Sequence, residues 1–243
     1  MAKLDTPLLS IVVPCFNEAA AIPKLAGALE PVLASTCSDD YEVVLIDDGS
    51  RDNTADAIDQ WCSSNARVCG LFLSRNFGKE AALSCGLHFA RGRAVVILDA
   101  DLQDPPDLIP AMLARWRDGA DVVLAKRVAR KRDGWIKRIT ARAFYRVMAW
   151  LAESMVPPQV GDFRLLDRRV VDALAQLPER TRFMKGLMNY AGFKIDALEY
   201  ERPGRSTGQS QWSLWRLWNL ALDGITSFTT VPLRAWSYLG VLV

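Results

Sequence analysis

The sequence predicts an α/β protein built around a mostly parallel sheet. In the first half of the chain, short apolar runs alternate with segments of helical character, and this βαβα rhythm is typical of a parallel sheet with helices on both faces. Half of the 243 residues are apolar, which is enough for one substantial core. Polar residues gather where several of the apolar runs end, and ligands bind such sheets at the carboxyl ends of the strands.

Five apolar runs are short enough and rich enough in β-branched residues to be strands. They are residues 8–13, 41–46, 68–73, 94–98 and 120–124. The segments between them predict helices near residues 19–33, 53–64, 79–91 and 106–118. The last helix follows Pro105-Pro106, because proline is well tolerated in a first helical turn.

Composition argues against several classes of protein. The formal net charge is +2, which gives no reason to expect a nucleic-acid partner. The five cysteines contain no C-x-x-C pair and are odd in number, so neither a disulfide framework nor a zinc knuckle is expected. We therefore expect the protein to be located in a reducing compartment. The single histidine, His88, lies in a predicted helix, which argues against a Ser-His-Asp triad and a histidine-rich metal site.

The fourth predicted strand ends in the acidic stretch DADLQDPPD. Alternation along an extended chain would send Asp99 and Asp101 to one side, with Gln103 two residues further on. Three such oxygens suit a hard cation, and Mg²⁺ or Mn²⁺ bound by one or two carboxylates keeps positions free for water and substrate phosphates. The stretch therefore points to a nucleotide diphosphate. The alternative is an ordinary acidic turn, because a D-x-D motif is short.

The first two predicted strands also end in polar residues. In PCFNE, at residues 14–18, Glu18 could bind ribose hydroxyls or favour the positive end of the following helix. In DDGS, Asp47 or Asp48 could accept hydrogen bonds from a uracil or guanine ring or from a ribose. Residues 52–54 have the composition of helix caps.

The loop SRNFGK, at residues 74–79, combines two cations with a glycine before a predicted helix. Such a loop could face a phosphate, since helix N-termini and basic side chains both favour anions. A solvated turn would explain the same residues.

Taken together, PCFNE, DDGS, SRNFGK and DADLQDPPD resemble the inverting family-two glycosyltransferases, in this order and spacing. The resemblance covers roughly residues 8–235 and is closer to the polyprenyl-phosphate branch, which includes dolichyl-phosphate mannose synthases and bacterial undecaprenyl-phosphate glucosyltransferases. It implies the Rossmann-like nucleotide-diphospho-sugar transferase fold and metal-dependent transfer from a nucleotide sugar. UDP is weakly favoured over GDP.

The resemblance also implies roles for particular residues. Those expected to bind the nucleotide sugar are Pro14, Phe16, Glu18, Ile46, Asp48, Lys79, Asp99 and Ala100. Asp99, Asp101 and Gln103 would bind the Mg²⁺ or Mn²⁺ ion. Asp101 and Asp162, the latter in the motif GDFRLLDR, would be catalytic.

The second half of the chain is expected to bind the acceptor. Eight basic residues lie between Lys126 and Arg142 against one acid, which fits either a solvated face or a surface facing anionic lipid. By the resemblance, the residues that bind the acceptor phosphate are Arg127, Arg130, Arg202, Arg205 and Ser210. Gln211 departs from the family, where a lysine is common, so a phosphate-binding role at that position is in doubt.

Three parts of the chain are expected, beginning with a catalytic domain over residues 1–210. Residues 211–230 predict an amphipathic juxtamembrane helix rich in tryptophan, which would lie at the membrane interface or pack on the core. Residues 231–243 would begin a membrane anchor that is truncated or absent, since spanning needs about 20 apolar residues.

These expectations describe an enzyme at the cytoplasmic face of the inner membrane. It would transfer a sugar from a nucleotide-sugar donor to a polyprenyl phosphate with inversion, and a homo-oligomer is left open. The alternatives are a glycosyltransferase of polysaccharide synthesis and a catalytically inactive lipid-binding scaffold. Because a phosphate acceptor is largely a dianion at neutral pH, we expect Asp162 to orient acceptor-binding groups such as Arg127 and Arg205 more than to remove a proton.

Overall fold

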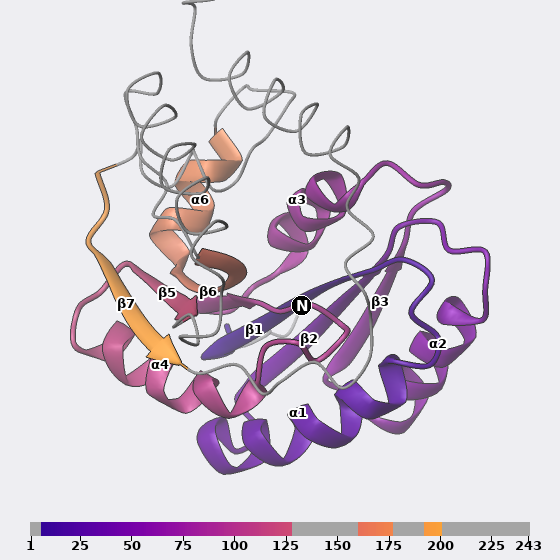
Figure 1. Ribbon diagram of the computed structural model, residues 1–243, viewed down its shortest axis with the longest axis horizontal. Coiled ribbons are helices and arrows are strands. Elements are labelled where there is room, and N and C mark those ends of the chain that lie inside the picture. The colour runs from indigo at the N-terminus through magenta and orange to yellow at the C-terminus, as the bar shows by residue number, and fades with distance from the viewer. Residues whose placement is uncertain (1–5, 128–159, 177–191, 201–243) are drawn as a thin grey trace, which may run out of the picture. The chain divides into compact units, whose positions relative to one another are not determined.

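The computed structural model describes residues 6–127, 160–176 and 192–200, which all fall within one compact unit. They form a sheet with helices on both faces (Figure 1). The predicted amphipathic helix, the predicted anchor and the domain boundary at residue 210 lie outside the described residues. No helix within the described ranges is long and apolar enough to cross a membrane.

Seven strands make up the sheet. In chain order they are β1 (Leu9–Cys15), β2 (Tyr41–Asp47), β3 (Val68–Phe72), β4 (Ala94–Ile97), β5 (Val122–Arg127), β6 (Val160–Asp167) and β7 (Ile195–Tyr200). Their order across the sheet is β3-β2-β1-β4-β6-β5-β7. β6 runs antiparallel to β4 and β5, and the other pairings among these strands are parallel. The predicted, mostly parallel sheet is confirmed, and the five predicted strands correspond to β1–β5.

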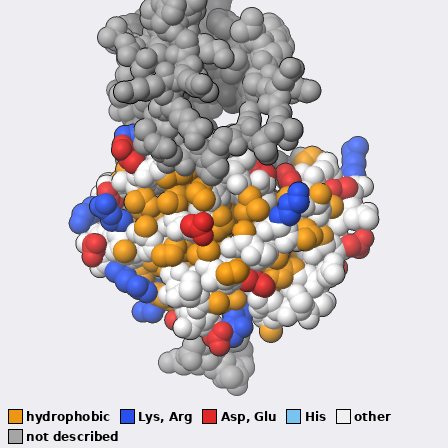
Figure 2. Space-filling view, turned by 60° about the horizontal axis from the view of Figure 1, so that its bottom comes forward, with side chains coloured by type: hydrophobic (Ala, Val, Ile, Leu, Met, Phe, Trp, Pro, Cys, Tyr) orange, Lys and Arg blue, Asp and Glu red, His pale blue; other side chains and the backbone are white. Residues whose placement is uncertain are grey.

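The helices cover the sheet in two layers. They are α1 (Ile22–Cys37), α2 (Thr54–Ser64), α3 (Lys79–Phe89), the short 3₁₀ helix η1 (Pro106–Leu108), α4 (Ile109–Arg117) and α6 (Arg168–Gln176). Figure 1 shows α1, α2 and α4 on one face and α3 and α6 on the other. Figure 2 brings the side of α1 and α4 forward, where apolar side chains are interspersed with charged side chains of both signs. The four helices predicted from the sequence are all present.

Alternate residues of each central strand face the two helical layers. Ile11 packs with Leu25 under α1, whereas Val12 packs with Leu83 under α3. Because both faces are covered, the parallel strands are continuous apolar runs in the sequence. At Gly86 of α3, a Cβ atom would lie 2.5 Å from side-chain atoms of Val12 and Ile46, so glycine allows this helix to approach the sheet closely.

β6, α6 and β7 were not predicted. β6 has the alternation of a strand, with Phe163 and Leu165 in one core and Leu166 in the other. Asp162 and Arg164 alternate with Phe163 and Leu165, so β6 lacks the continuous apolar run by which the predicted strands were recognised. Since β6 is antiparallel, its first residues lie at the carboxyl edge of the sheet, meaning the edge where the parallel strands end.

A buried polar network closes the opposite, amino edge of the sheet. Ser10 Oγ donates to Glu42 Oε1 at 2.7 Å, and the Gly92 N–H donates to Ser10 Oγ at 2.7 Å. The Arg91 guanidinium donates to Glu42 Oε2 at 2.6 and 2.9 Å, and its backbone N–H donates to Oε1 at 2.6 Å. These bonds attach the connection between α3 and β4 to the starts of β1 and β2.

Candidate active site

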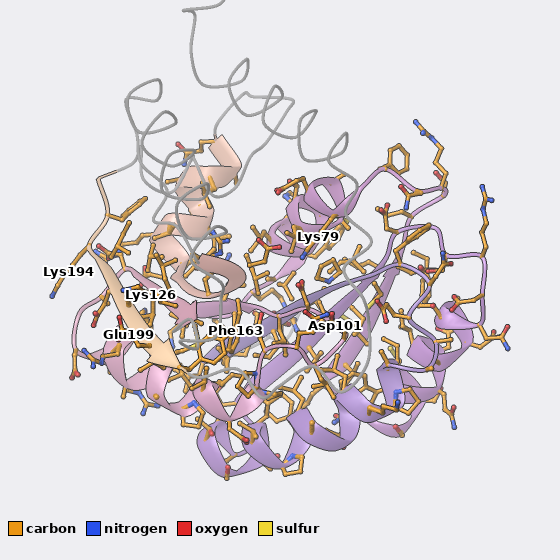
Figure 3. The ribbon with its side chains drawn as sticks, viewed as in Figure 1. Lys79, Asp101, Lys126, Phe163, Lys194 and Glu199 are labelled. Carbon is orange, nitrogen blue, oxygen red and sulfur yellow. The ribbon has the colours of Figure 1, made fainter. Side chains whose placement is uncertain are left out.

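A cavity of about 260 Å³ opens at the carboxyl ends of β1, β2 and β4. Its wall consists of Pro14, Cys15, Phe16, Glu18, Asp48, Asn76, Gly78, Lys79, Ala82, Asp99, Ala100 and Asp101. Figure 3 shows Lys79 at the start of α3 and Asp101 at this edge of the sheet. The cavity therefore brings together every residue expected to bind the nucleotide sugar except Ile46.

Ile46 does not line the cavity. It is fully buried in β2 and belongs to the core between the sheet and α3, where its side chain lies beside Gly86. The expectation of a side chain in the nucleotide pocket is wrong at this position, because strand alternation turns residue 46 towards the helix.

Two loops support one side of the cavity by bonding to each other. The Glu18 N–H donates to Thr54 Oγ1 at 2.8 Å, and the Ala19 N–H donates to Asp52 Oδ2 at 3.2 Å. Asn53, the residue before α2, makes no side-chain cap. Asp52 Oδ1 does accept the N–H of Thr54, the first residue of α2, at 3.1 Å, so residues 52–54 help to begin this helix as expected and also hold the loop that carries Glu18.

Asp48 fixes the loop that precedes Lys79. It is almost fully buried, and its two carboxylate oxygens accept the backbone N–H groups of Phe77 at 2.8 Å and Gly78 at 2.9 Å. Gly49 has a φ of +67°, and a Cβ there would lie 2.4 Å from the backbone of Arg75. The DDGS motif thus positions the SRNFGK loop. Any hydrogen bond from Asp48 to a nucleotide would be additional to these two.

Lys79 lies between two acidic side chains. Its Nζ atom is 2.6 Å from Asp99 Oδ1, past the end of β4, and 2.6 Å from Asp162 Oδ2, near the start of β6. Burial disfavours its charge, but the two carboxylates outweigh that effect and raise the pKa of Lys79 above its ordinary value. The other cation of this loop points elsewhere, since the Arg75 guanidinium lies over the Phe77 ring at 4.2 Å from its centroid.

The cavity holds more acid than base. Burial raises the pKa of Asp99, Lys79 partly offsets this, and Asp162 and Asp101 raise it further. Burial likewise raises the pKa of Glu18, followed by repulsion from Asp101 and other acids. These pKa directions are those of carboxylates short of positive charge.

The donor set fits a divalent cation that is shared with a substrate. Asp99 and Asp101 present hard oxygen ligands at one wall of the cavity, together with Glu18. Within the described residues, no group of three or more His, Cys, Asp or Glu side chains forms a complete metal site. The pair of carboxylates at Asp99 and Asp101 fits Mg²⁺ or Mn²⁺, which is usually bound by one or two carboxylates plus substrate phosphates.

The acidic motif is a turn rather than an extended segment. β4 ends at Ile97, and Leu102 has a φ of +54°, so the chain reverses between Asp99 and Gln103. The expected alternation of three oxygen ligands is therefore wrong. Gln103 does not line the cavity, and its backbone N–H donates to Asp101 Oδ1 at 3.0 Å. A metal-binding role for its side chain stays a prediction.

Arg164 contacts Asp162 and was not among the site residues predicted from the sequence. It is buried, and its guanidinium donates to the backbone oxygens of Asp162 and Gly161, both at 3.0 Å. Its Nη2 atom also lies 3.5 Å from Asp162 Oδ1. Strand alternation places residues 162 and 164 on one face, and this periodicity was the signal that could have revealed the pair.

The acceptor residues are described only in part. Arg127 is the last residue of β5, and its backbone pairs with Tyr200 at the end of β7. Nearby, Lys126 pairs with Val160 at the start of β6. Arg130, Arg202, Arg205 and Ser210 lie outside the described residues. β5 and β7 themselves end at the edge of the sheet at which β6 begins.

The fold is that of the GT-A nucleotide-sugar transferases. The structure is similar to a mannosyltransferase from Pyrobaculum calidifontis in complex with GDP-Man and Mn²⁺, with a TM-score of 0.59 and 21% identity over 84% of this chain and 59% of that one. It is also similar to glucosyl-3-phosphoglycerate synthase from Mycobacterium tuberculosis in complex with Mn²⁺, UDP-Glc and phosphoglyceric acid. Here the TM-score is 0.57 and the identity 21% over 90% of this chain and 77% of that one.

The chain belongs to glycosyl transferase family 2, whose family model matches residues 10–174. It is 46% identical to an uncharacterized glycosyltransferase of Synechocystis sp., over 97% of this chain and 74% of that protein. It is 46% identical to the bactoprenol glucosyl transferase of Shigella phage SfV and 45% identical to a prophage bactoprenol glucosyl transferase homolog of Escherichia coli. Both similarities cover 97% of this chain and 76% of the relative. The family predicted from the four motifs is confirmed.

Proposed function

We propose that this glycosyltransferase transfers a sugar from a nucleotide-diphosphate sugar to a polyprenyl phosphate, with inversion at the anomeric carbon. The observation that carries the proposal is the convergence of Asp99, Asp101 and Asp162 at the carboxyl edge of the sheet. The names of the bactoprenol glucosyl transferases support both a lipid acceptor and a glucosyl donor. UDP-glucose is accordingly the donor to test first.

The cavity wall supports the donor half of the proposal. Phe16 is 42% exposed and offers an apolar surface to the nucleotide, while Glu18 lies within reach of ribose hydroxyls. Asp99 and Asp101 would bind Mg²⁺ or Mn²⁺ on the diphosphate. When bound, that cation supplies electrostatic stabilisation of the charge on the leaving group.

The sheet topology supports the acceptor half. β5 and β7 both end at the carboxyl edge of the sheet, where β6 with Asp162 begins, and the arginine-bearing segments follow these two strands in the sequence. Four cations at positions 127, 130, 202 and 205 would complement a phosphate. A nucleophilic phosphate oxygen placed there would attack the anomeric carbon from the side opposite the diphosphate.

Asp162 would orient the groups that bind the acceptor and would not need to remove a proton from it. A phosphate monoester has a second pKa of about 6, so the acceptor already carries most of its negative charge at neutral pH. Among the described residues, Asp162 contacts Lys79 and Arg164, which hold its carboxylate on two sides. The partners Arg127 and Arg205 that we expected for it stay predictions.

The proposed acceptor places the reaction at a membrane, and we propose the cytoplasmic face of the inner membrane. The basic run after β5 and the tryptophan-rich segment at 211–230 would supply the contact. Flotation with anionic vesicles at low and high salt tests this part, because electrostatic attachment weakens as salt screens it. Protein that stays unbound at low salt would contradict it.

Transfer itself is tested with the purified chain, UDP-glucose, Mg²⁺ or Mn²⁺ and a short-chain polyprenyl phosphate. We expect equal amounts of UDP and glucosyl lipid, each dependent on both the lipid and the metal. UDP-GlcNAc and GDP-mannose are tested in place of UDP-glucose as comparison donors. Transfer to an oligosaccharide with none to the lipid would favour polysaccharide synthesis, and binding of lipid without any turnover would favour the inactive scaffold.

A further inference from the structure

The Lys79 ammonium contacts Asp99, which is one of the two carboxylates expected to bind the divalent cation. Its Nζ atom is equally close to Asp99 and Asp162, at 2.6 Å from an oxygen of each. Asp99 follows β4 and Asp162 lies in β6, so the Lys79 ammonium joins carboxylates from two separate parts of the chain. The ammonium between them offsets the repulsion of the two carboxylates, and Arg164 lies further from Asp162, at 3.5 Å.

The same position cannot serve Lys79 and a divalent cation at once. A metal ion bound by Asp99 would approach the oxygen that Lys79 contacts, and two cations at that spacing repel each other. The donor diphosphate removes this conflict, because it brings new negative charge into the cavity and offers the lysine another partner. The Lys79 side chain is 42% exposed, so its flexible stem has room to move.

The backbone that carries Lys79 is well fixed, which confines such a movement to the side chain. Asp48 binds the N–H groups of the two preceding residues, Phe77 and Gly78. Gly78 and Lys79 both line the cavity at the start of α3, an 11-residue helix. The ammonium group can therefore turn from the two carboxylates towards a diphosphate without a rearrangement of the loop.

We propose that, without donor, the Lys79 ammonium is the counter-ion of Asp99 and Asp162 and hinders the binding of a divalent cation there. When metal and donor bind together, the ammonium moves to the donor diphosphate. The inference rests on the proposed function, since it assumes a metal–diphosphate donor. Lys79 then has two successive partners. In the free enzyme it neutralises Asp99 and Asp162, and in the donor complex it releases both and contacts the leaving group. Metal and nucleotide consequently bind cooperatively.

The test measures Mn²⁺ binding directly, by electron paramagnetic resonance of free Mn²⁺, with and without UDP. In the absence of UDP, Lys79→Met is expected to bind Mn²⁺ at least about fivefold more tightly than the wild type, the lower end of typical coupling between sites. UDP should tighten Mn²⁺ binding strongly in the wild type and much less in the variant. By thermodynamic linkage, Mn²⁺ must tighten UDP binding by the same factors, which calorimetry checks.

Three further variants define the effect. Lys79→Arg keeps a cation and should retain the weak Mn²⁺ binding of the wild type. Arg115→Met removes the cation of the ion pair with Asp196, which lies at α4 and β7, and should leave Mn²⁺ binding unchanged. If Lys79→Met does not fold, Lys79→Gln provides the same comparison with a neutral side chain that still donates a hydrogen bond.

The outcomes separate this inference from the proposed function. Unchanged or weaker Mn²⁺ binding by the neutral variants, with normal Mn²⁺–UDP binding by the wild type, would overturn the counter-ion role and leave the proposed function standing. Absence of Mn²⁺ binding with or without UDP, in the wild type and in Lys79→Met alike, would overturn both. Tight Mn²⁺ binding to Lys79→Met in a protein that transfers no sugar to lipid would support the counter-ion and contradict the acceptor.

Discussion

The two edges of the sheet hold acidic side chains in opposite ways. At the amino edge, both oxygens of buried Glu42 accept hydrogen bonds from Ser10 and Arg91, so the charge is fully compensated within the chain. At the carboxyl edge, Asp99 and Asp162 share the ammonium of Lys79, and Arg164 Nη2 lies 3.5 Å from the Asp162 carboxylate. The first arrangement is complete by itself, whereas the cavity wall at the second edge carries four carboxylates against the one ammonium of Lys79.

The direction of pKa shifts records the same difference. Burial opposes ionisation of Asp167, at the amino edge, but hydrogen bonds from Trp116 and Arg169 outweigh this effect and lower the pKa of the carboxyl group. Burial raises the pKa of Asp99, and Lys79 offsets this only in part. A lowered pKa means that folding favours the carboxylate, and a raised one means that folding opposes it. At the carboxyl edge, folding therefore disfavours the ionised form of Asp99, and a bound cation would offset this cost in stability.

The largest expected effect is on turnover, through Asp101. This side chain is exposed, so Asp101→Asn should leave folding intact while lowering turnover by about 10²- to 10³-fold, through lost stabilisation of the leaving diphosphate. UDP release and thermal unfolding measure the two properties. A folded variant with near-normal turnover in Mg²⁺ or Mn²⁺ would show that the metal assignment is wrong.

Replacement of Asp162 should also affect turnover, and its pH dependence reveals the role of this residue. If the carboxylate orients groups around the acceptor, Asp162→Asn should lower turnover by a similar factor, roughly 10²-fold, at pH 6 and pH 8.5. Steady-state rates with the lipid acceptor at both pH values provide the measurement. A deficit that disappears at the higher pH would instead identify Asp162 as a general base.

At the amino edge the expected effect is on stability alone. Glu42→Gln places an amide against the Arg91 guanidinium and should lower the free energy of unfolding by about 2–3 kcal/mol, with UDP affinity unchanged. Glu199→Gln is the matched control, because it removes the exposed pair with Lys126 and should cost less than about 1 kcal/mol. Urea unfolding compares them. Equal losses would mean that burial of Glu42 adds nothing.

The smallest expected effect is the pH dependence contributed by Asp167. Its folded pKa is lowered, so its stabilisation is present above the unfolded pKa of about 3.9 and is lost as the pH falls through the folded pKa. Asp167→Asn should therefore be less stable than the wild type by about 1 kcal/mol at pH 7, and the difference should vanish in acid. Unfolding curves from pH 7 to pH 2.5 measure it. A difference that persists at the lowest pH would assign the effect to packing.

The central parallel strands β1, β2 and β4 were predictable because they are buried on both faces. Their apolar runs are continuous, and the polar motifs follow at once, as at Asp48 and Asp99. β6 was not predicted, because Asp162 and Arg164 interrupt its apolar pattern. Strand assignment from sequence therefore failed at the strand that carries a candidate catalytic residue.

The cavity wall was largely predicted, but the contacts within it were not. Lys79 and Asp162 are 83 positions apart in the sequence, and only the antiparallel placement of β6 brings them together. Asp48 was assigned to a nucleotide, yet its carboxylate binds backbone groups 29 and 30 positions away. Such long-range contacts depend on topology, which residue patterns do not specify. The wrong assignment of Ile46 has the same origin, since the face of a strand is fixed by what packs on it.

The antiparallel strand has a consequence for how the enzyme can diversify. Lys126 near the end of β5 pairs with Val160 at the start of β6, so the chain leaves the sheet and returns to it at one place. Insertions or replacements between these two points leave the register of the sheet unchanged, and doubling the length of a flexible loop costs only about 0.6 kcal/mol. All residues that line the cavity precede this position in the chain, so relatives could be recombined there while the cavity is kept.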